Sequence, residues 1–127
     1  MDSRVLIYVE SRYKVDRKKI KAAIEDVLIQ QDIKSSTEVS VAVVGDRKMT
    51  GLNKKYREKE GTTNVLSFPL AEGEQTHLPT DILRLGDIVI SYPQVIRDAS
   101  RDEVLVDEKI DELVRHSMLH LLGVHHQ

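Results

Sequence analysis

The chain has 127 residues, of which 40% are hydrophobic and 31% are charged, and its formal net charge is −2. This length suits one domain with a single core, and the composition is far from the low hydrophobicity of disordered chains. We therefore expect residues 1–127 to form a single folded domain.

Missing features exclude further classes of protein. No apolar run approaches the roughly 18 to 20 residues that cross a bilayer, and the N-terminus lacks a basic segment followed by an apolar one. We therefore expect a cytoplasmic protein with no membrane partner. Cysteine is absent, which excludes disulfides and thiolate ligands, so any metal site must use His, Asp or Glu.

The charged residues are distributed unevenly. Basic residues gather in residues 12–21 and 47–59, whereas acidic residues gather in residues 102–112. A basic run is most often a solvated helix face, so this distribution supports an RNA partner only weakly.

The hydrophobic pattern predicts alternating strands and helices in the first half of the chain. Residues 5–9 have the β-branched and aromatic content of a buried strand, and Asp16 is the expected N-cap of a helix that follows. Residues 39–44 form a second predicted strand, and a second helix follows it. The expected core face of the first helix is Ile20, Ala23, Ile24, Val27 and Leu28, and that of the second is Met49, Leu52 and Tyr56.

Two further strands are predicted, each preceded by a polar segment. A loop at residues 58–63 leads to a strand at residues 65–68 that Pro69 ends. An exposed connection at residues 72–81 then leads to a strand at residues 85–92.

The last third of the chain is predicted to be helical. A short helix runs from residue 93 to about residue 100, and after a break at residues 101–106 a long helix begins, capped by Asp107 and ended by a left-handed Gly123. The expected core face of the long helix is Ile110, Leu113, Val114, Ser117, Met118 and Leu121. The predicted fold class is α+β, a mixed sheet of about four strands packed with helices, with histidines on and just after the last helix.

Four of the five histidines lie in the last dozen residues. His116 and His120 are one helical turn apart, so their imidazoles can face one ion, and Gly123 lets the chain turn back so that His125 or His126 can supply a third nitrogen. Three imidazoles leave a fourth tetrahedral position for water, as in a catalytic zinc site. The spacing does not choose between His125 and His126, and it is also compatible with a surface coincidence.

The residue after the first histidine argues against a peptidase. Zinc proteases with two helical histidines carry a Glu there as general base, whereas this chain has Ser117. His77 stands apart from the other histidines in a polar segment and is interpreted as solvated surface.

The C-terminal motif resembles that of the YbeY family of endoribonucleases, which is His-x3-His-x5-His with a Gly shortly after the second His. His116, His120 and His126 have this spacing, and Gly123 has the expected place. The resemblance implies that His126, rather than His125, is the third ligand. Ser117 stands where the family usually has Gly, and His125 where it frequently has Asp.

Other segments match the family in the same order and extend the resemblance over about the last two thirds of the chain. These segments are Leu52-Asn53 with Tyr56-Arg57-Glu58-Lys59, Thr63-Asn64-Val65-Leu66-Ser67-Phe68-Pro69, and Leu85-Gly86-Asp87-Ile88-Val89-Ile90-Ser91.

The resemblance implies one zinc ion per chain, held by the three histidines. Zinc lowers the pKa of bound water toward neutrality and polarises a phosphoryl oxygen, which suits phosphodiester cleavage. Arg57 and His116 are the expected catalytic residues, and Arg57 and Lys59 are suited to binding phosphates. Asn64, Ser67 and Asp87 are candidates to line the same cleft, although each also suits a structural role.

The family implies a substrate class and partners that the residues alone do not name. The substrate is precursor ribosomal RNA, cut during maturation of the 3′ end of the small-subunit RNA, with a part in ribosome quality control. The expected partners are small-subunit ribosomal proteins and a ribosome-associated GTPase.

Two other functions fit the same residues. One is a non-catalytic RNA-binding assembly factor in which metal only stabilises the C-terminus. The other is a zinc hydrolase of a different substrate, such as a peptide or an ester.

Overall fold

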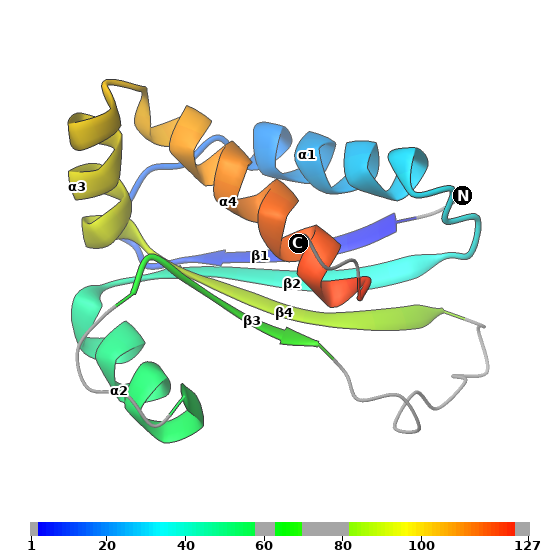
Figure 1. Ribbon diagram of the computed structural model, residues 1–127, viewed down its shortest axis with the longest axis horizontal. Helices are drawn as coiled ribbons and strands as arrows, with labels where there is room; N and C mark the ends of the chain where they lie inside the picture. Colours follow the sequence, from blue (N-terminus) through cyan, green and yellow to red (C-terminus); the bar gives the residue numbers. More distant parts are fainter. Residues whose placement is uncertain (1–2, 58–62, 70–81, 124–127) are drawn as a thin grey trace.

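The computed structural model describes residues 3–57, 63–69 and 82–123, which form an α+β fold (Figure 1). The elements in chain order are β1 (Ser3–Val9), α1 (Arg17–Gln30), β2 (Thr37–Val44), α2 (Asp46–Arg57), β3 (Val65–Pro69), β4 (Leu83–Ser91), α3 (Tyr92–Asp102) and α4 (Val106–Leu121).

The four strands form one mixed sheet in the order β1-β2-β4-β3. β1, β2 and β4 are parallel, and β3 runs antiparallel to β4 at the edge of the sheet. The predicted fold class, a mixed sheet of about four strands with helices, is confirmed.

Helices cover the two faces of the sheet unequally. α1 and α4 lie side by side on one face, whereas α2 lies on the other (Figure 1). The main core is between the sheet and the α1–α4 pair, and a smaller cluster of Val44, Met49, Leu66 and Val89 packs under α2. Among the described residues, no helix therefore covers much of the face away from α1 and α4 (Figure 1).

The core faces predicted for α1 and α4 are confirmed. Every residue expected to face inward from these two helices is buried. Asp16 is the N-cap of α1, and its side chain accepts a hydrogen bond from the Lys19 backbone N–H at 3.1 Å. Local apolar periodicity determines such faces, because residues three and four apart share one side of a helix.

The prediction that Asp107 caps α4 is wrong. The N-cap is Leu105, which makes no capping hydrogen bond through its side chain, and Asp107 lies in the first helical turn. The Asp107 carboxylate instead accepts a hydrogen bond from the backbone N–H of Asp16 at 3.1 Å. This acidic residue therefore connects the start of α4 to the start of α1.

The predicted starts of three strands lie two residues too late, because pairing extends these strands. Ser3 pairs with Thr37, and Thr37 pairs with Leu83, so three strands begin at these positions. The last strand ends before Tyr92 because Ser91 caps α3. The predicted loop at 58–63, apart from residue 63, and the connection at 72–81 lie outside the described residues.

Gly86 permits the close approach of β3 to β4. Its φ is +141°, and a Cβ at this position would lie 2.3 Å from the Phe68 carbonyl oxygen and 3.0 Å from Cδ2 of Leu121. The same residue takes part in a β-bulge, since Glu38 pairs with Arg84 and Val39 with Gly86. A side chain here would displace the edge strand and the end of α4.

We expect Gly86→Ala to lower the free energy of unfolding by at least the roughly 1–3 kcal/mol that such backbone strain costs. Urea unfolding measures the effect. Gly51→Ala is the matched control. Apart from the backbone of α2 itself, no atom in the part of the chain that the structure describes lies within 4 Å of a Cβ at position 51. This substitution should therefore stabilise α2 by about 0.5–1 kcal/mol. Equal unfolding midpoints for the two variants would contradict this account.

Candidate functional site

α4 presents two of the predicted metal ligands on its outer side. His116 and His120 are exposed, whereas the intervening Ser117 and Met118 are buried against the sheet. Residues four apart lie one turn apart on the same side of a helix. The helix thus carries both histidines on one exposed side.

The third predicted ligand follows the end of this helix. Gly123 has a φ of +77°, the left-handed conformation that commonly ends a helix, as predicted. His125, His126 and the isolated His77 lie outside the described residues. Within residues 3–57, 63–69 and 82–123, no group of three or more His, Asp or Glu side chains is placed to hold a metal ion. The described pair can supply two imidazole nitrogens, which zinc accepts, so the donor set fits this metal.

An ion-pair network fixes the middle of α4 to α1. The Arg115 guanidinium donates hydrogen bonds to Asp26 of α1 and, at 3.0 Å, to Asp111 one turn earlier in α4. These two carboxylates, with Asp26 having the larger effect, raise the pKa of Arg115. Since Arg115 directly precedes His116, the network holds the backbone of the first histidine against the body of the protein.

A buried lysine fixes the start of α4. Lys109 is only 7% exposed, and its ammonium donates to Asp102 and to Glu112, each at 2.7 Å. Hydrogen bonds hold the pKa of Asp102 below its ordinary range, and the bond from Arg101 has a larger effect than the one from Lys109. The hydrogen bonds to Asp102 and Glu112 raise the pKa of Lys109. The corner between α3 and α4 is therefore stabilised by charge.

This network predicts a loss of stability in acid. Because the pKa of Asp102 is lowered by folding, its contribution is present above its ordinary pKa of about 3.9 and is lost as the pH falls toward the folded-state value. We expect the difference in unfolding free energy between the wild type and Asp102→Asn to shrink below about pH 4. Urea unfolding at a series of pH values measures it. If the unfolding free energies of the two proteins ran parallel between about pH 5 and pH 2, the Asp102 carboxylate would make no contribution to stability.

The C-terminal end of α4 packs where β3 and β4 meet. Leu121 is buried, and its side chain lies close to Gly86, as described above. α4 also contacts β3. The helix that carries the histidines therefore has a fixed position over the antiparallel edge of the sheet.

One of the two predicted phosphate-binding residues, Arg57, belongs to a helix on the other side of the sheet (Figure 1). Arg57 is the last residue of α2, and Lys59 lies outside the described residues. The start of α2 is anchored by Asp46, which accepts hydrogen bonds from Ser91 and Arg97, each at 3.0 Å. Because α2 and α4 lie on opposite faces of the sheet, a site that contains both Arg57 and the histidines must reach around β3.

The structure separates the three polar residues that were candidates to line one cleft. Asn64 donates to the Asp98 carboxylate at 2.9 Å and so connects the start of β3 to α3. Ser67 pairs with Ile88 of the main core, on the side of α4. Asp87 points to the opposite face, where the Ser40 hydroxyl donates to it. Ser67 and Asp87 therefore cannot face the same cleft.

The sequence interpretation missed the buried Lys109. A signal was present, since Lys109 lies four residues before Leu113 and eight before Ser117, on the side predicted to face the core. A lysine in such a position needs carboxylate partners, because burial of an unpaired charge is costly.

None of the helices in the described part of the chain combines the length and the apolar character needed to span a bilayer.

The fold and the site together define a small α+β protein whose last helix carries a surface pair of histidines. A family model described as "Endoribonuclease YbeY" matches residues 7–127. A protein of Syntrophus aciditrophicus with the same name is 35% identical over 118 residues, which are 93% of this chain and 72% of the relative. An Acinetobacter baumannii protein of that name is 37% identical over 111 residues, 87% of this chain and 70% of its own length.

A solved structure agrees with these relatives. The solution structure of a Thermotoga maritima protein has a TM-score of 0.59 and 25% identity, and the match covers 97% of this chain and 75% of that one. The chain belongs to the YbeY family of endoribonucleases, enzymes that hydrolyse phosphodiester bonds in RNA. The resemblance first indicated by the histidine motif is confirmed.

Proposed function

We propose that this protein is a zinc-dependent endoribonuclease that cuts single-stranded RNA and takes part in ribosomal RNA maturation. One observation carries the proposal: in a chain of this family, α4 exposes His116 and His120 one turn apart, with the spacing of the family's metal motif. A surface site suits a polymeric substrate, which cannot enter a closed cavity.

One zinc ion per chain would be held by His116, His120 and His126. When bound, zinc supplies a Lewis acid that polarises phosphoryl oxygens and makes water more acidic. The anchoring of α4 through Arg115 and Lys109 supports this role, because a metal site needs ligands that are already in place. His116 is catalytic in this sense, as a ligand beside the reacting phosphate.

Arg57 and Lys59 are proposed to bind the substrate. A guanidinium donates paired hydrogen bonds to phosphate oxygens and stabilises the charge that develops as the phosphodiester is cleaved. Two nucleophiles suit this reaction, water and the ribose 2′-hydroxyl. The products distinguish them, since attack by the 2′-hydroxyl leaves a 2′,3′-cyclic phosphate.

The family relation extends the proposal to a substrate and to partners. The substrate is precursor ribosomal RNA, with cleavage near the 3′ end of the small-subunit RNA and a part in ribosome quality control. Small-subunit ribosomal proteins and a ribosome-associated GTPase are the proposed partners, and the cytoplasm is the proposed location.

In the deciding experiment, the zinc-loaded protein is incubated with a ribosomal RNA precursor that extends beyond the 3′ end of the small-subunit RNA, and cleavage is measured. The proposal requires discrete products whose ends can be mapped. RNA that is bound but stays intact at full zinc occupancy would replace it with the assembly-factor function. Hydrolysis of a peptide or ester instead of RNA would replace it with a different hydrolase.

A further inference from the structure

The sheet face away from α1 and α4 carries a row of side chains that no described helix fully covers. The strand register places Leu6 beside Ser40, Ser40 beside Asp87, and Asp87 beside Phe68. Leu6 is 51% exposed, and the Asp87 carboxylate accepts a hydrogen bond from the Ser40 hydroxyl. This row therefore offers apolar surface with one polar pair in the middle.

A second row runs beside the first. Tyr8 pairs with Ala42, and Ala42 pairs with Val89. The end of this row at Val89 is covered by α2, whereas Tyr8 at the other end is 59% exposed. A large aromatic ring is thus presented to solvent on a flat strand surface. The part of the two rows that is exposed or half-buried beyond α2 is called the open face below; it consists of Leu6, Tyr8, Ser40, Ala42 and Asp87.

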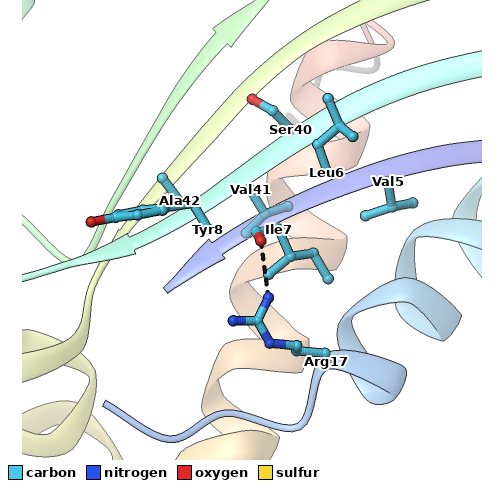
Figure 2. Close-up of a pocket in the computed structure, with 8 residues that line it drawn as sticks. All are labelled: Val5, Leu6, Ile7, Tyr8, Arg17, Ser40, Val41 and Ala42. Carbon is cyan, nitrogen blue, oxygen red and sulfur yellow. Dashed lines mark hydrogen bonds between the residues drawn. The ribbon is translucent and has the colours of Figure 1, made fainter. Parts of the chain in front are cut away.

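Two hollows meet on the open face. One, of about 540 Å³, lies at β1 and is lined by residues that include Leu6, Tyr8, Ser40 and Ala42. Figure 2 shows Leu6 and Ser40 on one side of the strands, with Val5, Ile7 and Arg17 on the side of α1. The other, of about 450 Å³, is lined by Ser40, Ala42, Asp87, Phe68 and Leu52 of α2. Because Ser40 and Ala42 line both, the two hollows adjoin at β2, and together they are called the groove below.

Basic residues flank the groove on the side of α2. Leu52 lines the groove, so Lys48, four residues earlier, and Lys55, three residues later, lie on the same side of the helix. Both lysines are exposed. Their ammonium groups add positive charge at the end of the groove beside α2.

Arginines flank the groove along the strands as well. One row before Leu6, the guanidinium groups of Arg4 and Arg84 form ion pairs with the Glu38 carboxylate, with N···O distances of 3.6 and 3.1 Å. The two arginine side chains remain 60% and 58% exposed. Two guanidinium groups share one carboxylate there. By formal charge, the two arginines and two lysines at the rim outnumber the carboxylates of Glu38 beside them and of Asp87 in the floor.

We propose that the open face binds single-stranded RNA, with bases stacked on Tyr8 and Leu6 and phosphates beside Lys48, Lys55 and the two arginines. An aromatic platform with a cationic rim matches such a strand, since every base has a π face and every linkage a negative charge. The inference rests on the proposed function and extends it. The groove would hold RNA on the face opposite the histidines, so the strand would pass around β3.

The polar pair adds a base preference. An exposed carboxylate accepts hydrogen bonds from an exocyclic amine and repels a carbonyl oxygen, so Asp87 favours cytosine, with its N4 amine, over uracil, with its O4. The Ser40 hydroxyl, which donates to Asp87, fixes the direction of the carboxylate. Oligocytidylate should therefore bind more tightly than oligouridylate of the same length.

Stacking is tested by fluorescence anisotropy of labelled oligocytidylate with the zinc-loaded full chain, read at times short enough that a gel shows the RNA to be uncut. We expect Tyr8→Ala to weaken binding by about five- to a hundredfold, the effect typical of losing one base stack. Ile29→Ala is the matched control, because Ile29 is an apolar residue of α1 that is 66% exposed. It should bind RNA like the wild type.

Charge and base preference are tested in the same assay. Lys48→Gln should reduce the slope of log K against log salt by about 0.7, the value for one phosphate of a single strand. Lys34→Gln, at a lysine 85% exposed elsewhere, should leave the slope unchanged. Asp87→Asn should remove the preference for cytosine over uracil.

The outcomes separate this inference from the proposed function. Wild-type affinity in Tyr8→Ala and Lys48→Gln would overturn the RNA groove and leave the open face to a protein partner, while cleavage by the wild type would still support the enzyme. A wild type that neither binds nor cleaves RNA would overturn both. Weakened binding in the two variants, with both controls unchanged, supports the groove.

Discussion

Replacing His120 with alanine should abolish zinc binding and RNA cleavage together. Two ligands hold a catalytic zinc poorly, and even the loss of a hydrogen-bond partner of a ligand typically costs about 10- to 100-fold in affinity or activity. We therefore expect a loss larger than this, measured by elemental analysis and by cleavage of a ribosomal RNA precursor. The wild type should contain about one zinc per chain.

Exposure of the residue makes this test interpretable. His120 is exposed on α4, so its replacement should leave the core and the circular dichroism spectrum unchanged. His77→Ala, which removes a histidine far from the motif in the sequence, is the control and should keep both zinc and activity. Cleavage that persists in His120→Ala without bound metal would contradict the zinc mechanism.

Arg57→Ala should slow cleavage by about 100- to 1,000-fold, the effect typical of losing one group that stabilises transition-state charge. Zinc content should not change, because Arg57 ends α2 and is not a proposed ligand. Arg57→Lys should restore only part of the rate, since an ammonium lacks the paired donors of a guanidinium. Single-turnover cleavage at saturating protein measures these rates.

The control for this prediction lies on the same helix. Lys54 is an exposed residue of α2, and Lys54→Ala removes one positive charge three residues before Arg57. It should have a small effect on the rate. An equal loss in Lys54→Ala and Arg57→Ala would mean that α2 acts only through its overall charge. Weaker RNA binding in Arg57→Ala with an unchanged rate would assign the residue to binding alone.

Helix faces could be predicted because their signal is local. The spacing of Ile20, Ala23, Ile24, Val27 and Leu28 places them on one side of α1 whatever the sheet does, and all five are buried. The same reasoning predicted the inner side of α4 and therefore the outward position of His116 and His120. Capping was less predictable, since Asp107 has the right residue type but its carboxylate accepts a hydrogen bond from the backbone N–H of Asp16.

Relations across the sheet could not be predicted from one sequence. Asn64, Ser67 and Asp87 occur in neighbouring motifs, yet Ser67 lies on the side of α4 and Asp87 on the open face. Strand pairing decides this, because a shift of one residue moves every side chain to the other face. The bulge at Gly86 is such a shift, and the residue pattern around it does not reveal it.

The sequence by itself determined the elements, the helical spacing of His116 and His120 and the family resemblance, because each depends on residues close together in the chain. The tertiary structure alone decided that α2 and α4 lie on opposite faces of the sheet and that Tyr8 remains exposed. These features depend on contacts between residues far apart in the chain or in neighbouring helices. Such contacts are chosen by the packing of the whole sheet, which no local pattern contains.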